Sequence, residues 1–481
     1  MTTISTTTPL PTVDYSRKWY VMLAVGLASF LETIDTSIVN IALPTLVRSF
    51  AVDFSIVQWV VLAFVLTQAT LMLVIGRVGD MVGKKRIFIA GLIVASFGSI
   101  LCGLAPDIWW LIGFRIIQGI GVAMALALGM GIVTEAFPPE ERGLALGTIG
   151  AIVSIGIILG PLIGGWMLEM LSWRWIFLMA VPLALVDIPI AQRFLPDSQP
   201  TGGQKFDFVG AGTFFVFLLL FLLGITGGQQ DGYDSLIVQI LLAASALFLL
   251  VFAILETRIE QPVIDVRLFR SSLFSINLLL RLLSFVIYVG VLLLLPFYLE
   301  NIRGFSPRYS AMLFVVPSIC FGIAAPTAGR LSDRFGTHRI MLAGLVMMIF
   351  GCYSLGTLTD TTSLFGYVWR LIPFGLGMGV FQAPNNSVIF GLVPTERLGM
   401  TSGLMSVMRT LGRSFGIAII GGFWTSRVTQ YAGKQLTGGV TEAPINMQLA
   451  GMQDAFILAA AILIGALLLS GWSFLQEQRA H

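Results

Sequence analysis

Long apolar stretches, separated by short polar connections, dominate the chain. Residues 54–76, 87–106, 143–168, 309–329 and 455–475 contain no Asp, Glu, Lys or Arg. Each is at least as long as the ~20 residues that a helix needs to cross ~30 Å of hydrocarbon. Because helices and closed barrels alone satisfy their backbone hydrogen bonds in lipid, these runs predict membrane-spanning helices.

The same pattern along the whole chain predicts an all-α polytopic membrane protein with about fourteen spans. Of the 481 residues, 56% are hydrophobic and only 11% are charged, whereas a soluble chain has roughly a quarter charged. A water-soluble fold is therefore excluded. The predicted spans cover residues 19–43, 54–76, 87–105, 108–133, 143–169, 175–195, 208–228, 235–256, 272–299, 308–328, 340–358, 364–392, 400–424 and 454–475.

Basic residues in the connections predict the orientation of these spans. Most of the 28 Lys and Arg residues lie in the termini and in the loops that follow even-numbered spans. Since cytoplasmic loops carry the excess of Lys and Arg, we expect both termini in the cytoplasm and the protein in the plasma (cytoplasmic, inner) membrane. The opposite side holds Arg48, Arg174, Arg303, Arg308, Arg427 and Lys434.

Two patterns recur in the second half of the chain. The loop Gly76-Arg-Val-Gly-Asp80-Met-Val-Gly83-Lys84-Lys85-Arg86 has a counterpart in Gly329-Arg-Leu-Ser-Asp333-Arg-Phe-Gly336-Thr-His-Arg339. Gly143, Gly147, Gly156 and Gly160 recur, at one common offset, as Gly399, Gly403, Gly412 and Gly416. These matches predict two six-helix halves in parallel repeat, as some transporters have.

The repeat divides the chain into five parts. We expect a cytoplasmic tail at 1–18, an N-terminal six-helix half at 19–195, and a linker with two additional membrane helices at 196–270. A C-terminal six-helix half follows at 271–476, and a cytoplasmic tail at 477–481. The two helices in the linker are interpreted as an inserted structural hairpin.

Motifs in three spans add to the loop pattern. The first span ends in Asp35-Thr-Ser-Ile-Val-Asn40-Ile-Ala-Leu-Pro44, and the fourth contains Arg115-Ile-Ile-Gln118-Gly119. The fifth contains Gly147, Gly156, Gly160, Pro161, Gly164 and Gly165. Together they resemble the major facilitator superfamily, and the first and fifth spans resemble its fourteen-span drug:proton antiporter branch. The chain departs from that branch at Ala180, where Asn is usual, and at Arg413, where a small residue is typical.

This resemblance implies a major-facilitator-type fold, two six-helix halves plus two inserted central helices. It also implies a proton-coupled antiporter of the multidrug efflux type, which exports hydrophobic or amphipathic small molecules, cations among them, by alternating access. The proton gradient would be the energy source, with no cofactor. The expected partners are a lipophilic substrate, protons and the bilayer, with no nucleic acid, and the expected state is a monomer.

Two carboxylates and one arginine are expected at membrane depth. Glu32 and Asp35 share one face of the first span, and Arg115 reaches a similar depth in the fourth. A charge there costs about 2.5–3.5 kcal/mol, so it is a functional candidate. Burial and pairing with Arg115 act in opposite directions on carboxylate protonation, so movement of Arg115 would load and release a proton. The alternative is a static ion pair that fixes the two helices.

Two further motifs suggest moving parts. The glycines of the fifth span permit close packing and Pro161 a kink, which together predict a bendable seam between the halves; packing alone is the alternative. The loop is interpreted as a conformational latch and topology anchor, and a solvated charge run is its alternative. The expected loop residues are Gly76, Asp80, Gly83, Lys84, Lys85, Arg86, Gly329, Asp333 and Gly336.

Polar and aromatic groups within the spans are candidates for a substrate cavity, because apolar cavities with a few polar groups suit lipophilic ligands. For the two charged members, pairing with a neighbour for assembly is equally open. The candidates are Gln58, Trp59, Asp187, Arg281, Tyr288, Gln382, Asn385 and Asn386.

Three other functions remain open at this stage. An exporter of the same fold dedicated to one metabolite, amino acid, siderophore or lipid would show a narrow substrate profile. A non-transporting receptor would need a sizeable soluble domain, and a membrane enzyme would need a nucleophile or metal constellation; neither pattern is present in the sequence. The three cysteines and two histidines lack the spacing of metal ligands, so we expect no metal site. No phosphate-binding loop of the P-loop type occurs, so we expect no direct use of ATP.

Overall fold

The computed structural model describes residues 15–138, 141–196, 207–258, 266–393, 398–433 and 439–480, and the regular structure in these ranges is helical. The N-terminal half comprises α1 (Lys18–Phe50), α2 (Phe54–Val82), α3 (Lys84–Gly103), α4 (Ile108–Ala136), α5 (Arg142–Met170), α6 (Trp175–Leu178) and α7 (Ala180–Phe194). A hairpin of α8 (Phe208–Asp231) and α9 (Leu236–Arg258) follows.

The C-terminal half begins at Ser272 and contains two π-helical turns, η4 and η6. Its elements are α10 (Ser272–Phe297), η4 (Tyr298–Ile302), α11 (Pro307–Phe314), α12 (Val316–Phe335), α13 (Thr337–Leu355), α14 (Leu364–Gly391), α15 (Leu398–Gly416), η6 (Ile417–Gly421), α16 (Gly422–Ala432) and α17 (Ile445–Ala480).

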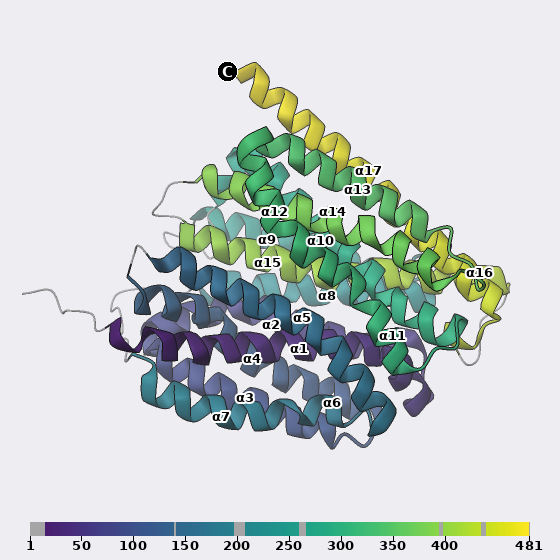
Figure 1. Ribbon diagram of the computed structural model, residues 1–481, viewed down its shortest axis with the longest axis horizontal. Helices are drawn as coiled ribbons and strands as arrows, with labels where there is room; N and C mark the ends of the chain where they lie inside the picture. The colour runs from purple at the N-terminus through teal and green to yellow at the C-terminus, as the bar shows by residue number, and fades with distance from the viewer. Residues whose placement is uncertain are drawn as a thin grey trace, which may run out of the picture.

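The two halves lie side by side, and most of their long helices run in the same general direction (Figure 1). In that view the purple and blue helices of the N-terminal half lie below the green and yellow helices of the C-terminal half. We call the end of the molecule at which α1 begins the near face and the end at which α1 stops the far face. The near face is the one expected in the cytoplasm.

Helix–helix contacts repeat between the halves in the same way as the sequence motifs. In α3 and α4, a Cβ on Gly91 would lie 2.7 Å from the carbonyl oxygen of Gly121. In α13 and α14, a Cβ on Gly344 would lie 2.9 Å from the carbonyl oxygen of Gly377. In both pairs the backbones touch, because neither glycine has a side chain to separate the helices.

Twelve helices in the described part of the chain are long and apolar enough to cross a membrane. The chain is thus a multi-pass membrane protein, but only twelve of the expected fourteen spans are supported. The apolar part of α8 is the shorter segment Val209–Ile225. The rod of α15, η6 and α16 contains Arg409, Arg413 and Arg427, which lower its hydropathy.

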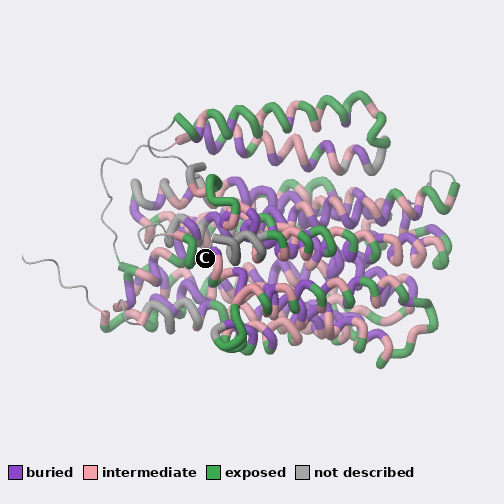
Figure 2. Tube along the Cα trace, turned by 90° about the horizontal axis from the view of Figure 1, so that it is seen from above, coloured by how far each residue is buried: buried purple, intermediate pink, exposed green. Residues whose placement is uncertain are grey.

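The α8–α9 hairpin forms a separate layer at the edge of the molecule, drawn at the top of Figure 2. Phe214, Leu218 and Leu222 of α8 belong to one apolar cluster with Leu66 of α2 and Leu411 of α15. The hairpin therefore packs over the line where the two halves meet, while the outer side of α9 is largely exposed.

Candidate functional site

Asp35 of α1 and Arg115 of α4 form a buried ion pair. Arg115 Nη1 lies 2.7 Å from Asp35 Oδ2, and the two side chains are 0% and 6% exposed. Gln118, one turn along α4, donates from Nε2 to Asp35 Oδ1 at 2.9 Å and to Ser99 Oγ of α3 at 2.9 Å. One network thus joins three helices of the N-terminal half around a single carboxylate.

The guanidinium of Arg115 has further partners that fix its position. Its Nε donates to the carbonyl oxygen of Val60 at 2.9 Å, and Nη1 also donates to Gln118 Oε1 at 2.7 Å. The ring of Phe64 lies 3.9 Å from the guanidinium carbon, a cation–π contact. Gly119 lets α2 approach, because a Cβ there would lie 3.0 Å from the Phe64 carbonyl oxygen.

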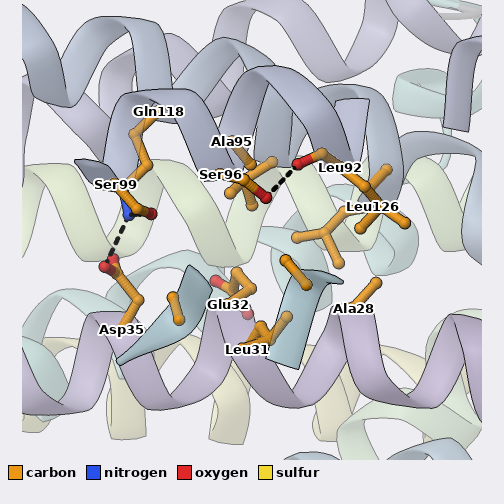
Figure 3. A pocket seen from close by; sticks show the side chains of 14 residues that line it. Ala28, Leu31, Glu32, Asp35, Leu92, Ala95, Ser96, Ser99, Gln118 and Leu126 are labelled. Atoms are coloured by element: carbon orange, nitrogen blue, oxygen red, sulfur yellow. Dashed lines mark hydrogen bonds between the residues drawn. The ribbon is translucent and has the colours of Figure 1, made fainter. Parts of the chain in front are cut away.

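A cavity of about 40 Å³ lies beside this network, between α1, α3, α4 and α7. Glu32, Asp35, Ser96, Ser99 and Gln118 supply its polar lining, and Figure 3 shows both carboxylates extending from α1 toward α3 and α4. Since one water needs roughly 10–15 Å³ of such volume, the cavity can hold a few water molecules and is too small for a drug-sized compound.

Glu32 connects the two halves. Arg413 Nη1 of α15 donates to Glu32 Oε1 at 3.2 Å, and the side chains of Arg413 and Glu32 are 16% and 11% exposed. Thr36 Oγ1 donates weakly to the same carboxylate oxygen at 3.4 Å. The carboxylate therefore lines the water-sized cavity of one half while it pairs with a cation of the other.

Three of the fifth-span glycines pack inside the N-terminal half. A Cβ on Gly156, Gly160 or Gly164 would lie 3.0 Å or less from Thr33, Ser37 or Ile38 of α1. The expected seam between the halves is therefore wrong for these three positions, because their contact is α5 on α1. The environment of Gly147 lies outside the described residues, and Pro161 lies within the helix.

Gly165 is the member of the motif that meets the other half. A Cβ on Gly165 would lie 2.4 Å from Ala311 Cβ and 2.8 Å from the Pro307 carbonyl oxygen, both in α11. This contact belongs to the far face, where Arg48 Nη2 also lies 2.5 Å from Glu300 Oε2. The halves are thus closed against each other at the far face.

The loop motif ends α2 and α12 with the same backbone turn. Gly83 and Gly336 have φ values of +108° and +93°, a region that favours glycine. Lys84 pairs with Glu135 at the end of α4, Lys85 is half-buried and Arg86 is exposed. A Cβ on Gly76 or Gly329 would meet nothing within 4 Å among the described residues, whereas a Cβ on Gly79 would lie 2.2 Å from Leu128 Cδ2 of α4. The side chains of Asp80 and Asp333 lie outside the described part.

The eight substrate-cavity candidates do not gather at one place, and none lines the cavity of Figure 3. Gln58 is fully buried in α2, and Trp59 packs against the core. Tyr288 stacks on Phe374, with ring centroids 5.6 Å apart. Asp187 is fully buried in α7, and neither carboxylate oxygen has a hydrogen-bond partner among the described residues.

Four of the five candidates of the C-terminal half lie nearer to one another. Arg281 of α10 donates from Nη1 to Asn386 Oδ1 of α14. Asn385 Nδ2 donates to the carbonyl oxygen of Asn277 at 3.1 Å. Gln382 lies one turn before Asn386, and its Oε1 has no hydrogen-bond partner among the described residues.

Sequence reasoning missed two members of the site. Ser99 gave no signal, because a serine inside an apolar span is more often a packing residue that bonds its own helix. Arg413 was noted as a departure from the usual pattern, but its pairing with Glu32 joins residues 381 positions apart and no local pattern indicates it.

Comparison with known proteins agrees with this architecture. The Major Facilitator Superfamily profile matches residues 25–417. The riboflavin transporter RibZ of Clostridioides difficile (strain 630) is 33% identical over 456 residues, which cover 94% of this chain and 97% of that protein. The multidrug resistance protein Stp of Mycobacterium tuberculosis (strain CDC 1551 / Oshkosh) is 32% identical over 401 residues, covering 83% and 74%.

Solved structures show the same fold. A bacterial homologue of the human lysosomal transporter Spinster, in an inward-facing and unoccupied conformation, matches with a TM-score of 0.67 at 18% identity. The match covers 95% of this chain and 97% of that one. The all-helical fold and the profile match over most of the chain lead to one assignment: the chain belongs to the Major Facilitator Superfamily.

Proposed function

We propose that this protein is a proton-coupled antiporter that exports amphipathic small molecules by alternating access. The observation that carries the proposal is the position of Glu32. Its carboxylate lines a water-sized cavity together with Asp35, and it also forms the ion pair with Arg413 of the other half. A proton taken up there removes the negative charge that Arg413 attracts, so protonation and the contact between the halves are linked.

The packing of α5 supports a path from this carboxylate to the far face. The helix that carries Glu32 and Asp35 is held against α5 by Gly156, Gly160 and Gly164. The same α5 then meets α11 of the other half at Gly165. Because close backbone contacts transmit small shifts, a change at Glu32 would move α5 and loosen the far-face contact.

We further infer that the chain crosses the membrane fourteen times, as in the drug:proton antiporter branch it resembles. In this proposal, the two crossings beyond the twelve apolar helices are α8 and the rod of α15, η6 and α16. Arg413 of the rod pairs with Glu32 and Arg427 with Asp454 of α17, which supports a span of low hydropathy. Both termini would then lie in the cytoplasm.

The test is transport by purified protein in liposomes with an imposed pH gradient, with ethidium, a neutral lipophile and riboflavin as substrates. Gradient-driven accumulation of several compounds is expected, and it should be lost in Asp35→Asn. The control is Asp107→Asn, because Asp107 caps α4 far from the network and Asn caps a helix as well as Asp. Full gradient-driven transport by Asp35→Asn would refute the coupling role.

A second candidate function is a transporter dedicated to one metabolite. It is favoured by the riboflavin transporter that is 33% identical over nearly the full length of both chains. In the same assay this candidate predicts accumulation of riboflavin, or of one other compound alone, with no response to ethidium. A broad profile would exclude it.

A further inference from the structure

Three arginines of the C-terminal half form a row along one side of α15. Arg281 Nε of α10 donates to the carbonyl oxygen of Met405 at 3.0 Å. Arg409 lies one turn after Met405, and Arg413 one turn after that. Residues four apart lie on one face of a helix, so Arg409 and Arg413 share the face of α15 that includes Met405, where Arg281 of α10 bonds the backbone. We call Arg281, Arg409 and Arg413 the arginine row.

The row carries more positive charge than its surroundings neutralise. Among the described residues, Arg281 bonds two neutral acceptors, the Met405 carbonyl and the Asn386 amide. Arg409 lies within electrostatic range of Arg281, Arg413 and Glu32, and its buried Nε has no hydrogen-bond partner among the described residues. The carboxylate that contacts the row is Glu32, through Arg413.

Arg115 of the N-terminal half differs from the arginines of the row in having a full counter-charge. Arg115 is fully buried, and it has its own carboxylate, Asp35, at 2.7 Å. A guanidinium that is buried without a counter-charge is costly. The three guanidinium groups of the row have one carboxylate partner among the described residues, so a negative charge from outside the protein would balance the excess.

The same geometry disfavours a cation at this place. Asp35 is neutralised by Arg115 and Glu32 by Arg413. An incoming cation would meet two paired carboxylates and the excess charge of the row. An incoming anion would instead meet the excess positive charge of the row and bond Arg409, whose Nε has no hydrogen-bond partner among the described residues.

We propose that the arginine row binds the acidic group of an amphipathic organic anion, a carboxylate, sulfonate or phosphate ester. Guanidinium groups suit these anions because their planar donors match the oxygens. The substrate enters the seam with its acidic group on Arg409 and Arg281, while Glu32 stays ionised and paired with Arg413, so the bound anion and a proton on Glu32 belong to different states of the exchange cycle. This inference rests on the proposed antiport function, whose substrate class it specifies.

Binding of two dyes with one ring scaffold and opposite charge tests the inference. Carboxyfluorescein is the anion and rhodamine 123 the cation, each titrated by fluorescence polarisation against the full-length purified protein without a proton gradient. We expect the anion to bind at least about tenfold more tightly. Arg409→Gln should weaken anion binding by about tenfold, a loss typical of one charge-assisted hydrogen bond, and Arg409→Lys should restore most of it.

Two controls separate this effect from general damage. Arg370→Gln removes a guanidinium of the same half that bonds Ser354, Thr357 and Gly366 outside the row, and it should leave both affinities unchanged. Titrations in phosphatidylcholine nanodiscs with and without phosphatidylglycerol identify the source of the anion. Competition by phosphatidylglycerol would assign the row to a lipid headgroup, whereas no competition assigns it to a soluble organic anion; both outcomes support an acidic ligand.

Equal affinity for the two dyes, tighter binding of the cation, or no binding of the anion would overturn the inference. An equal loss of both dyes in Arg409→Gln would do the same. The proposed antiport function is judged separately, since gradient-driven export of ethidium that depends on Asp35 would uphold proton coupling while it refutes the anionic substrate class.

Discussion

Glu32 and Arg413 meet across the boundary between the two halves, with 3.2 Å between Oε1 and Nη1. They are the charged pair at mid-depth that connects α1 to α15 in the described part of the chain. Because Glu32 also lines the water-sized cavity, this pair is the point at which a proton and the relative position of the halves affect each other.

The first prediction concerns this pair. Glu32→Gln keeps a hydrogen-bond acceptor but removes the charge, a loss of about 1.5–3 kcal/mol for a charged hydrogen bond. Gradient-driven transport should fall by about tenfold or more, and substrate exchange without a gradient should persist. The double variant Glu32→Gln/Arg413→Gln should lose less than the product of the two single losses. Losses that multiply would show that the two residues act independently.

The second prediction concerns the stability of the Asp35–Arg115 pair. Arg115→Gln leaves the buried carboxylate of Asp35 without its cation, which should cost about 3–5 kcal/mol of the free energy of unfolding. Thermal unfolding in detergent should show a lower midpoint, and adding Asp35→Asn should recover part of the loss. As a control, Arg427→Gln removes the partly exposed pair with Asp454, and it should lower the unfolding midpoint much less, because solvent screens an exposed ion pair. No recovery in the double variant would contradict the prediction.

The third prediction concerns the far-face contact. Gly165→Val places methyl groups against Ala311 and Pro307, so it should separate the halves at the far face. Spin labels at Leu104 and Phe365, both strongly exposed, should move apart in a background without native cysteines. Gly150→Val is the control, because a Cβ on Gly150 of the same helix meets nothing within 4 Å. An unchanged label distance in Gly165→Val would argue against a gate at this position.

The fourth prediction concerns packing inside the N-terminal half. A Cβ in Gly121→Ala would lie 2.1 Å from the backbone nitrogen of Ala95, and backbone cannot yield as a side chain can. We expect a loss of about 1–3 kcal/mol or more from overpacking. Gly113→Ala, in the same helix with open space around it, should gain about 0.5–1 kcal/mol from helix propensity. The unfolding midpoints of the two variants should therefore shift in opposite directions.

Much of the architecture is predictable because lipid imposes a simple rule on the backbone. Charge-free runs such as residues 87–106 must form helices in a membrane, and α3 (Lys84–Gly103) covers most of this run. The repeat was visible because Gly83 and Gly336 serve the same left-handed turn in both halves. The span count was harder to predict, because α15 turns Arg409 and Arg413 toward other protein groups, so its composition differs from that of a lipid-facing helix.

The candidate site was likewise predicted only in part from the sequence. Local sequence identified Glu32, Asp35 and Arg115, because a charge at membrane depth needs a reason wherever it occurs. It did not indicate that the fifth-span glycines contact α1, since a pattern of small residues permits close packing but does not specify which helix packs there. It also did not indicate Ser99 in the Asp35 network.

The sequence by itself therefore determined the membrane class, the repeat and the charged groups that lie at membrane depth. These features depend on composition and on patterns within short stretches of sequence. Tertiary structure alone decided which charge meets which. Arg115 pairs with Asp35 within one half, whereas Arg413 pairs with Glu32 of the other half. Among the described residues, Arg281 and Arg409 have no carboxylate of their own. These pairings depend on how helices hundreds of residues apart are docked, and they decide how charge is distributed along the seam between the halves.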